Sequence, residues 1–440
     1  MDGTGMNAII PEAFTIRMRQ QLGDELSAFL CALEEPPLRG IRLNPLKMTD
    51  AADRYTGTER IPWADHAYYL REDTEAGVSV LHAAGAYYIQ EPGAMIPASV
   101  LHAEPGEKIL DLCAAPGGKS TQIGCAMMGC GLLVCNEPVP RRAQVLSGNI
   151  ERMGLPNTIV TCELPDRLAG RWPDGFDAVL VDAPCSGEGM FRRDPDTRKE
   201  WSAEKAEGCA VRQRGILAAA AVLVRPGGRL VYSTCTYNPA ENEENAHWFT
   251  DHFRAFHPEA FSLPGIDAPE GMYTCYPHRL KGEGQFTALF RKEGNTPAIL
   301  PVNHTLPAAG RGETELFKSV FPSFDRPTHL FGKTLVSMPE LPELKGIRTM
   351  RVGLHLGEVR GKTAIPDHAA AMCFRAPDIQ YTELGPDEAV SFVSGEVIPG
   401  DAEGWTLMRY QGMNIGWGKG NGGMIKNHYP KGLRDARLKT

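Results

Sequence analysis

The chain has 440 residues, of which 42% are hydrophobic and 23% are charged, and its formal net charge is −8. These values are ordinary for a globular protein of two to four domains, at roughly 100–200 residues each, and argue against a general coat for nucleic acid. No apolar run approaches the ~20 residues that a membrane-spanning helix needs, and the first residues lack the basic and apolar regions of a signal peptide. We therefore expect a cytoplasmic protein with no membrane partner.

The chain contains 11 cysteines, an odd number, and none of them forms a Cys-x-x-Cys pair. A disulfide framework is therefore not expected. Cys125, Cys130 and Cys135 recur every five positions, which is not the spacing of zinc ligands, and no His lies nearby. We predict no metal site and expect most of the cysteines to be small buried side chains.

The N-terminal part of the chain combines helical and strand patterns. Residues 11–33 have helical periodicity, and Gly40–Pro45 has the pattern of a short strand that ends at a proline turn. We predict a small N-terminal α+β domain over residues 1–92.

From Lys108 onwards, short apolar runs alternate with segments of helical periodicity. This alternation predicts an α/β fold in which a parallel sheet carries helices on both faces. We expect this α/β domain to cover residues 93–293 and to close with a strand over Gln285–Phe290. The predicted strands are 108–113, 132–136, 158–162, 177–182 and 229–234, and the predicted helices are 118–128, 138–153 and 203–224.

The stretch 293–313 is rich in Gly, Pro, Asn and Thr and is predicted to be a linker. Beyond it, short strand-like runs broken by Gly and Pro predict two small β-containing domains, over 303–375 and 385–440. From Thr406 to the end, seven Lys or Arg residues stand against Asp435 alone. Charge by itself supports a surface for a phosphate backbone and an ordinary solvated face equally.

The segment Ile109–Ser120 has the pattern of a strand, a glycine-rich turn and the start of a helix. Its two adjacent glycines allow close backbone approach to a ligand, and a helix N-terminus offers free N–H donors. Glu137 ends the next predicted strand, 20 residues after Gly117, where a carboxylate commonly binds ribose hydroxyls. This is the pattern of a nucleoside-binding site.

Three ligands compete for this loop. A phosphate-binding loop would need glycine at the position of Cys113, and the Gly-x-Gly-x-x-Gly pattern of dinucleotide sites is absent. S-adenosylmethionine, which has a ribose but no phosphate, fits best. The alternative is a purely structural strand–turn–helix.

Cys185 and Cys235 each follow an apolar run that is predicted to be a buried strand. Ligands bind at the carboxyl ends of strands in open α/β sheets, so we expect both thiols to face one pocket. A thiolate that adds to carbon 6 of cytosine makes carbon 5 nucleophilic toward a methyl sulfonium, and a base must then remove the carbon 5 proton. One cysteine suffices for attack, and the second can assist release. The alternative is that both cysteines are packing residues.

The residues around the thiols fit this chemistry. Asp182, three residues before Cys185, is placed to hydrogen-bond the ring. A free thiol is only slightly ionised at neutral pH, so the nucleophile needs a neighbouring positive charge. The candidates for that charge are Lys119, Arg192 and Arg193.

Three motifs, Cys113–Lys119, Asp182–Gly187 and Ser233–Thr236, together resemble the signature of the NOL/NOP2/Sun RNA cytosine-carbon-5 methyltransferases. The resemblance covers roughly residues 80–293 and includes Gln90-Glu91-Pro92 and Gln213. It implies a Rossmann-like, S-adenosylmethionine-dependent methyltransferase core. The run Gly187–Pro195 with Trp201, and the closing segments Gly416–Lys419 and Lys426–Arg434, resemble the bacterial F-type 16S rRNA methyltransferases, whose C-terminal part is a PUA-like RNA-binding module.

The resemblance assigns roles that the spacing leaves open. Without the resemblance, Cys185 is the natural candidate for the nucleophile, since it neighbours Asp182. The resemblance instead implies that Cys235 attacks the base and that Cys185 is needed for product release. It also implies that Asp182 is the catalytic aspartate, with Lys119 beside it. The adenine contact stays unassigned, between Glu163, Asp166 and backbone. The expected cofactor contacts are Cys113, Ala114, Ala115, Pro116, Gly117, Gly118, Lys119, Glu137, Arg142 and Asp182.

The expected function is methylation of carbon 5 of cytosine in 16S rRNA, in the decoding region, with S-adenosylmethionine as cofactor. The alternatives are a tRNA methyltransferase with the same core and a noncatalytic RNA-binding protein. The expected RNA contacts are Arg42, Lys426 and Arg434. We expect a monomer whose partner is 16S rRNA, either free or within the small ribosomal subunit.

Overall fold

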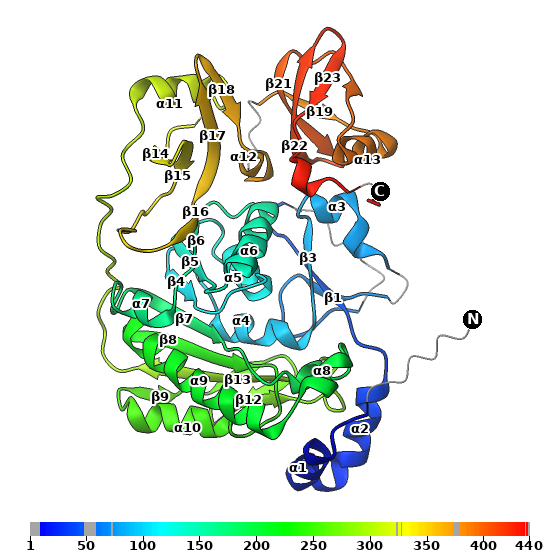
Figure 1. The fold of residues 1–440 in the computed structure, drawn as a ribbon, viewed down its shortest axis with the longest axis vertical. Coiled ribbons are helices and arrows are strands. Elements are labelled where there is room, and N and C mark those ends of the chain that lie inside the picture. The colour runs from blue at the N-terminus through cyan, green and yellow to red at the C-terminus, as the bar shows by residue number, and fades with distance from the viewer. Residues whose placement is uncertain are drawn as a thin grey trace, which may run out of the picture.

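The computed structural model describes residues 9–47, 59–71, 74–322, 324–326, 328–373, 379–435 and 437–438. A central sheet is flanked by an N-terminal domain and by two β-rich units from the C-terminal part of the chain (Figure 1). Within the described ranges, no helix has the length and apolar character needed to cross a bilayer.

The N-terminal domain combines a helical hairpin with a small antiparallel sheet. The helical segment predicted over 11–33 is two helices, α1 (Glu12–Leu22) and α2 (Leu26–Glu34), because the chain turns at Gly23, whose φ is 53°. The sheet has the order β2-β1-β3. Its strands are β1 (Gly40–Leu43), as predicted, β2 (Ala67–Tyr69) and β3 (Tyr87–Gln90), with the short α3 (Val80–Ala83) before β3.

The catalytic domain is an α/β sheet, as the alternation of elements predicted. Parallel strands run in the order β6-β5-β4-β7-β8, and the antiparallel β13 and β12 extend the sheet beyond β8. The strands are β4 (Lys108–Asp111), β5 (Leu132–Asn136), β6 (Thr158–Thr161), β7 (Phe176–Asp182), β8 (Val224–Thr234), β12 (Met272–Cys275) and β13 (Gln285–Lys292). The helices are α4 (Ile96–Leu101), α5 (Gly118–Ala126), α6 (Pro140–Met153), α7 (Pro165–Ala169), α8 (Asp196–Glu200), α9 (Ala203–Leu223) and α10 (Glu243–His252). The short strands β9 (Phe256–Pro258), β10 (Phe261–Leu263) and β11 (Ile266–Ala268) lie between α10 and β12.

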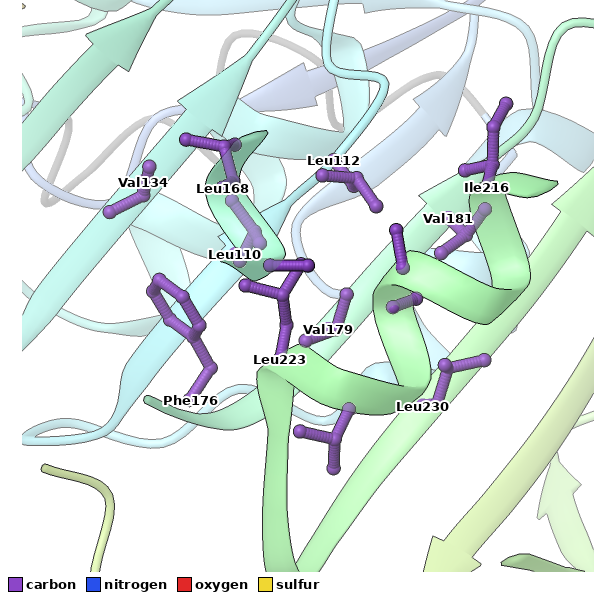
Figure 2. Close-up of a cluster of buried hydrophobic side chains, with 14 of the residues drawn as sticks. Leu110, Leu112, Val134, Leu168, Phe176, Val179, Val181, Ile216, Leu223 and Leu230 are labelled. Atoms are coloured by element: carbon purple, nitrogen blue, oxygen red, sulfur yellow. The ribbon is translucent and has the colours of Figure 1, made fainter. Parts of the chain in front are cut away.

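Helices cover both faces of this sheet because its buried strands are apolar on both sides. Leu110, Val179 and Val181 point to one face, where they pack against Leu223 and other residues of α9 (Figure 2). The residues that alternate with them, such as Ile109 and Leu180, belong to a second cluster on the opposite face, with α4, α5 and α6. All five of these side chains are fully buried.

The strand order places a crevice between β4 and β7. The chain runs outward from β4 through β5 to β6, and then returns to the other side of β4 as β7 and β8. In open α/β sheets, this reversal is where ligands bind. The loop after β4 and the loops after β7 and β8 therefore meet at one edge of the sheet.

The segment 303–375 is tied into the catalytic domain, which the sequence did not predict. β16 (Thr349–Val352) pairs antiparallel with β6 and forms an edge of the catalytic sheet. The remaining strands form an antiparallel sheet in the order β14-β15-β17-β18, and α11 begins at Arg311, inside the predicted linker. These elements are α11 (Arg311–Lys318), β14 (Thr328–Phe331), β15 (Thr334–Ser337), β17 (Leu354–Arg360), β18 (Thr363–Pro366) and α12 (His368–Cys373).

The C-terminal β-rich unit packs on the N-terminal sheet. Its strands have the order β19-β21-β22-β23-β20, with α13 (Pro386–Ser394) on one side. Phe392 and Met408 share one hydrophobic cluster with Ile41 and Tyr87, so a common core joins the C-terminal unit to the N-terminal sheet. The strands are β19 (Tyr381–Glu383), β20 (Ile398–Pro399), β21 (Gly404–Tyr410), β22 (Met413–Asn421) and β23 (Met424–Asn427).

Candidate active site

A cavity of about 350 Å³ opens at the carboxyl ends of the parallel strands. Its wall contains most of the residues that the sequence singled out, namely 113–116, Gly118, Lys119, Asp182 and Cys235. It also contains residues 88–91 at the end of β3, Met190 with Arg193, and residues 283–285. Of these, the sequence analysis gave a role in the chemistry only to Arg193, as a candidate positive charge near the thiols. The N-terminal domain thus supplies one wall of the cavity.

The loop after β4 is shaped for close contact with a ligand. Gly117 has a φ of 114°, which favours glycine, and it precedes the N-terminus of α5. Gly118 lies so near the N-terminal domain that a Cβ there would be 3.3 Å from the side chain of Gln90. Arg142 and Asn149 of α6 each donate a 2.9 Å hydrogen bond to a carbonyl of the loop, on Ala115 and Pro116.

Asp111, at the end of β4, is a cavity residue that the sequence analysis missed. Ser120 Oγ donates to its Oδ2 at 2.6 Å, while its Oδ1 is buried without a partner among the described residues. Burial raises the pKa of this carboxyl to about 7, against the opposing effect of the Ser120 hydrogen bond. A buried, unpartnered carboxylate oxygen fits a cationic group, such as the ammonium or sulfonium of S-adenosylmethionine.

Glu137 and Glu163, two of the carboxylates considered for the cofactor, are already engaged. Glu137 is buried; it accepts the backbone N–H of Val139 at 2.9 Å and pairs with Arg142 at 3.1 Å. Neither residue of this pair is among those lining the cavity. Glu163 accepts the backbone N–H of Arg348 at 2.7 Å, directly before β16. This carboxylate therefore connects the loop after β6 to the edge strand β16.

Lys119 and Asp182 join the two sides of the crevice. Lys119 Nζ donates to Asp182 Oδ2 at 2.7 Å, and Ser233 Oγ donates to Asp182 Oδ1 at 2.7 Å. Burial lowers and the Asp182 carboxylate raises the pKa of Lys119, with a net rise, so the ammonium keeps its charge at neutral pH. The pair holds a positive charge and a hydrogen-bonding carboxylate next to the thiol of Cys235.

The structure brings the two cysteines together. β7 and β8 are parallel neighbours in which Asp182 pairs with Ser233, so the residues after them converge. The Sγ atoms of Cys185 and Cys235 are 3.1 Å apart, and both thiols are free. The hydrogen bond to Cys235, together with burial, raises the pKa of Cys185, so Cys185 retains its proton beside the sulfur of Cys235. Of the two, Cys235 lines the cavity.

A buried hydrogen-bond network holds the two cysteine loops in register. Glu241 accepts from the backbone N–H of Ser186 at 2.9 Å and from Gln213 Nε2 at 2.9 Å, and Ser186 Oγ is 2.9 Å from Thr236 Oγ1. Gln213 also donates to the carbonyl of Pro184, which explains its place among the family positions. Glu241 was missed, because a Glu in the polar run 239–245 has the pattern of an exposed helix start.

The N-terminal helices brace the same loops from the other side. Glu188, which is fully buried, pairs with Arg17 of α1 at 2.6 Å and accepts the indole N–H of Trp201 at 2.8 Å. It also accepts the backbone N–H of Tyr237 at 3.1 Å, while the N–H of Gly189 donates to the carbonyl of Cys235 at 2.9 Å. The segment that resembles the F-type enzymes thus links α1 to the Cys235 loop.

Two arginines expected to be available for RNA or for thiol activation are buried instead. Arg42, expected to contact RNA, is 2% exposed, and it donates to Thr121 Oγ1 at 2.7 Å and to the carbonyl of Gly118 at 3.1 Å. It therefore anchors β1 to α5 and is not an RNA contact. Arg192 is paired with Glu283 at 2.9 Å and is likewise buried, so it does not activate a thiol.

The expected C-terminal contacts are exposed. Lys426 on β23 lies directly opposite Lys419 on β22, and the Lys419 ammonium is 5.4 Å from the ring centre of Trp405. Two like charges that face each other across a strand pair destabilise a sheet, and an anion between them relieves the repulsion. Arg434 is exposed and donates to the carbonyl of Tyr429 at 3.4 Å, and Lys439 lies outside the described residues.

No metal centre accompanies the cavity in the described part of the chain, where no group of three His, Cys, Asp or Glu side chains is arranged to hold an ion.

Four family descriptions match consecutive parts of the chain. Residues 98–291 match "16S rRNA methyltransferase RsmB/F", and residues 10–92 match "N-terminal domain of 16S rRNA methyltransferase RsmF". Residues 315–374 match "RsmF rRNA methyltransferase first C-terminal domain", and residues 380–435 match "Methyltransferase RsmF PUA domain". Each β-rich unit of the C-terminal part therefore corresponds to a described domain.

Individual proteins show the same likeness. The ribosomal RNA small subunit methyltransferases F of Salmonella heidelberg and Salmonella paratyphi A are each 35% identical to this chain over 470 aligned residues, covering 98% of both chains. A methyltransferase homologue from Pyrococcus horikoshii superposes with a TM-score of 0.57 at 27% identity, over 64% of this chain and 95% of that one.

NSun6 from the same archaeon, in a structure with SFG, has a TM-score of 0.55 at 22% identity, over 66% of this chain and all of that one, and shows the shared fold. The family matches confirm the predicted Rossmann-like methyltransferase core, its S-adenosylmethionine cofactor and the PUA-like module. The chain belongs to the RsmF family of S-adenosylmethionine-dependent 16S rRNA methyltransferases.

Proposed function

We propose that this protein methylates carbon 5 of cytosine in 16S rRNA, in the decoding region, through a covalent adduct between Cys235 and carbon 6 of the base. The observation that carries the proposal is the thiol pair, with sulfurs 3.1 Å apart, in which Cys235 lines the cavity beside the cofactor loop. Methyl transfer to a ring nitrogen or to a ribose hydroxyl requires no thiol. Two free thiols at one site therefore favour a ring carbon as the methyl acceptor.

Each residue around the thiols has a defined task in this reaction. The Cys235 thiolate forms a bond to carbon 6, and Asp182 hydrogen-bonds the ring, whose electrons shift toward carbon 5. S-adenosylmethionine, when bound, supplies the electrophilic methyl group that carbon 5 takes. Removal of the carbon 5 proton then restores the ring double bond and breaks the bond between sulfur and carbon 6.

Cys185 is suited to assist that last step. In the free enzyme its pKa is raised, first by the hydrogen bond to Cys235 and then by burial. When the sulfur of Cys235 is bonded to carbon, it no longer favours a proton on Cys185, so the first cause of the high pKa is removed. Cys185 therefore becomes a better base after the adduct has formed.

The substrate must offer an unstacked base. The site lies in a cavity that a paired base cannot reach, so the cytosine has to be extruded from its helix or lie in a single strand. Lys419 and Lys426 on the C-terminal unit provide positive charge for the RNA backbone. A monomeric state and a cytoplasmic location stay predictions.

Bisulfite sequencing of rRNA and tRNA from a strain that lacks this protein tests the proposal. We expect one or more cytosines of 16S rRNA to lose protection from conversion, while the tRNA pattern is unchanged. Loss of protection in tRNA alone would support the tRNA alternative, and no change in either RNA would contradict methylation at carbon 5.

A further inference from the structure

One charged group at the mouth of the cavity, considered in the sequence only as a candidate for thiol activation, has no partner within the described ranges of the protein. Arg193 lines the cavity together with Cys235 and Met190, and its side chain is exposed. No hydrogen bond or ion pair joins the Arg193 guanidinium to any part of the chain that the structure describes.

The other charges in the cavity wall are engaged within the protein. Lys119 is paired with Asp182, and the Glu283 carboxylate is paired with Arg192. The Glu91 carboxylate accepts the backbone N–H groups of residues 93, 94 and 283. Among the carboxylates of the cavity wall, Asp111 has an oxygen without a partner in the described chain, and it lies at the end of β4, directly before the cofactor loop. Arg193 is therefore the cation of the described cavity wall that remains available for an anion.

The backbone around Arg193 is held rigidly, so the guanidinium has a defined place. Phe191 is fully buried among the aromatic residues of α1 and α2, and Arg192 is buried in its pair with Glu283. The N–H of Asp194 donates to the carbonyl of Met190 at 2.7 Å, which closes a helical turn. This turn places Met190 and Arg193, three residues apart, together on the side of the cavity while Phe191 and Arg192 point into the protein.

We propose that Arg193 binds a phosphate next to the target nucleotide and so holds the extruded base in the cavity. The guanidinium is the side chain best suited to two parallel hydrogen bonds with phosphate oxygens. A base that enters between the cofactor loop and Cys235 brings its flanking phosphates to the mouth, where Arg193 lies. The inference rests on the proposed function, because it takes the occupant of this mouth to be RNA.

The test compares Arg193→Gln and Arg193→Lys with Arg212→Gln. Arg212 is an exposed residue of α9 that is not part of the described cavity wall, so it reports the loss of one positive surface charge. For an RNA fragment that contains the methylated site, we expect Arg193→Gln to weaken binding about tenfold, as for a lost charged hydrogen-bond pair. The slope of log affinity against log salt should fall by about 1, and Arg193→Lys should recover part of the affinity.

S-adenosylmethionine affinity separates this inference from its nearest rival. The cofactor carries a carboxylate, which is also an anion that Arg193 can bind. When S-adenosylmethionine is titrated into the full-length protein in a calorimeter, wild type and Arg193→Gln should have the same cofactor affinity. A drop in cofactor affinity with RNA affinity unchanged, or an RNA affinity equal to that of Arg212→Gln, overturns the inference. Binding is measured without methylation, so these results stand apart from the outcome of bisulfite sequencing.

Discussion

Asp111 is a residue whose environment prepares it for one ionic state in the free enzyme and another in the complex. Burial raises its pKa to about 7, so at neutral pH a large part of the population carries a neutral carboxyl group. A cation bound next to the unpartnered oxygen of Asp111 favours the ionised carboxylate. The attraction between the two charges contributes to binding only when Asp111 has lost its proton.

We therefore expect the affinity for S-adenosylmethionine to increase as the pH rises from about 6 to about 8, because ionised Asp111 attracts the cationic cofactor and neutral Asp111 does not. Asp111→Asn, which keeps the hydrogen bond from Ser120 and has no proton to lose, should bind more weakly at the upper pH and lose most of this dependence. Isothermal titration calorimetry across the range checks it. An unchanged pH dependence in the variant would show that Asp111 does not meet the cofactor's charge.

At the scale of elements, α1 and the segment 187–201 form one unit that positions the Cys235 loop. Arg17 is 171 residues from Glu188 in the chain, yet their ion pair and the cluster of Phe14, Phe191 and Trp201 lock the two segments together. Glu188 in turn holds the backbone of Tyr237, two residues after the proposed nucleophile. The Glu188 side chain thus connects Arg17 of α1 with the backbone of the Cys235 loop.

Arg17→Met should leave the Glu188 carboxylate buried without its ionic partner and lower the free energy of unfolding by about 3 kcal/mol. Adding Glu188→Gln should recover part of this loss, because the buried charge is removed. Urea unfolding measures both, and Arg19→Met, on the exposed side of α1, is the matched control. Methylation by the Arg17 variant should fall more than its cofactor affinity; equal losses would mean that α1 does not act through the Cys235 loop.

The sequence predicted the elements that are set by local pattern and missed those set by contact between distant segments. Apolar runs predicted β4 to β7 within two residues at each end but only the second half of β8, and the motifs placed Lys119, Asp182 and the two cysteines at one edge of the sheet. Nothing local distinguishes buried Arg42 from a surface arginine, because its burial depends on α5 packing over β1. The hydrogen bonds of Glu241 and the cavity wall formed by residues 88–91 likewise depend on contacts between segments that are distant in the sequence.

At the scale of the whole molecule, the N-terminal sheet and the C-terminal unit share one hydrophobic cluster, and β16 completes the catalytic sheet. The C-terminal unit is therefore part of the structural support of the N-terminal domain as well as a carrier of positive charge. Its removal would expose apolar side chains such as Ile41 and Tyr87, each of which is buried in the intact protein.

We expect deletion of residues 379–440 to lower the melting temperature as well as RNA affinity. A double charge reversal, Lys419→Glu with Lys426→Glu, should instead weaken RNA binding about tenfold or more while leaving the melting temperature nearly unchanged. Differential scanning calorimetry and a filter-binding assay at fixed salt separate the two effects. A deletion variant with the melting temperature of the full chain would contradict the shared core.

The central claim is that Cys235 attacks the base and Cys185 is needed for its release. Incubating the Cys185→Ala and Cys235→Ala variants with 16S rRNA and S-adenosylmethionine, followed by a denaturing gel, tests it most directly. The account predicts a slow-moving covalent protein–RNA band with Cys185→Ala, and neither band nor methylation with Cys235→Ala. A covalent band with Cys235→Ala, or continued methylation by that variant, would contradict the account.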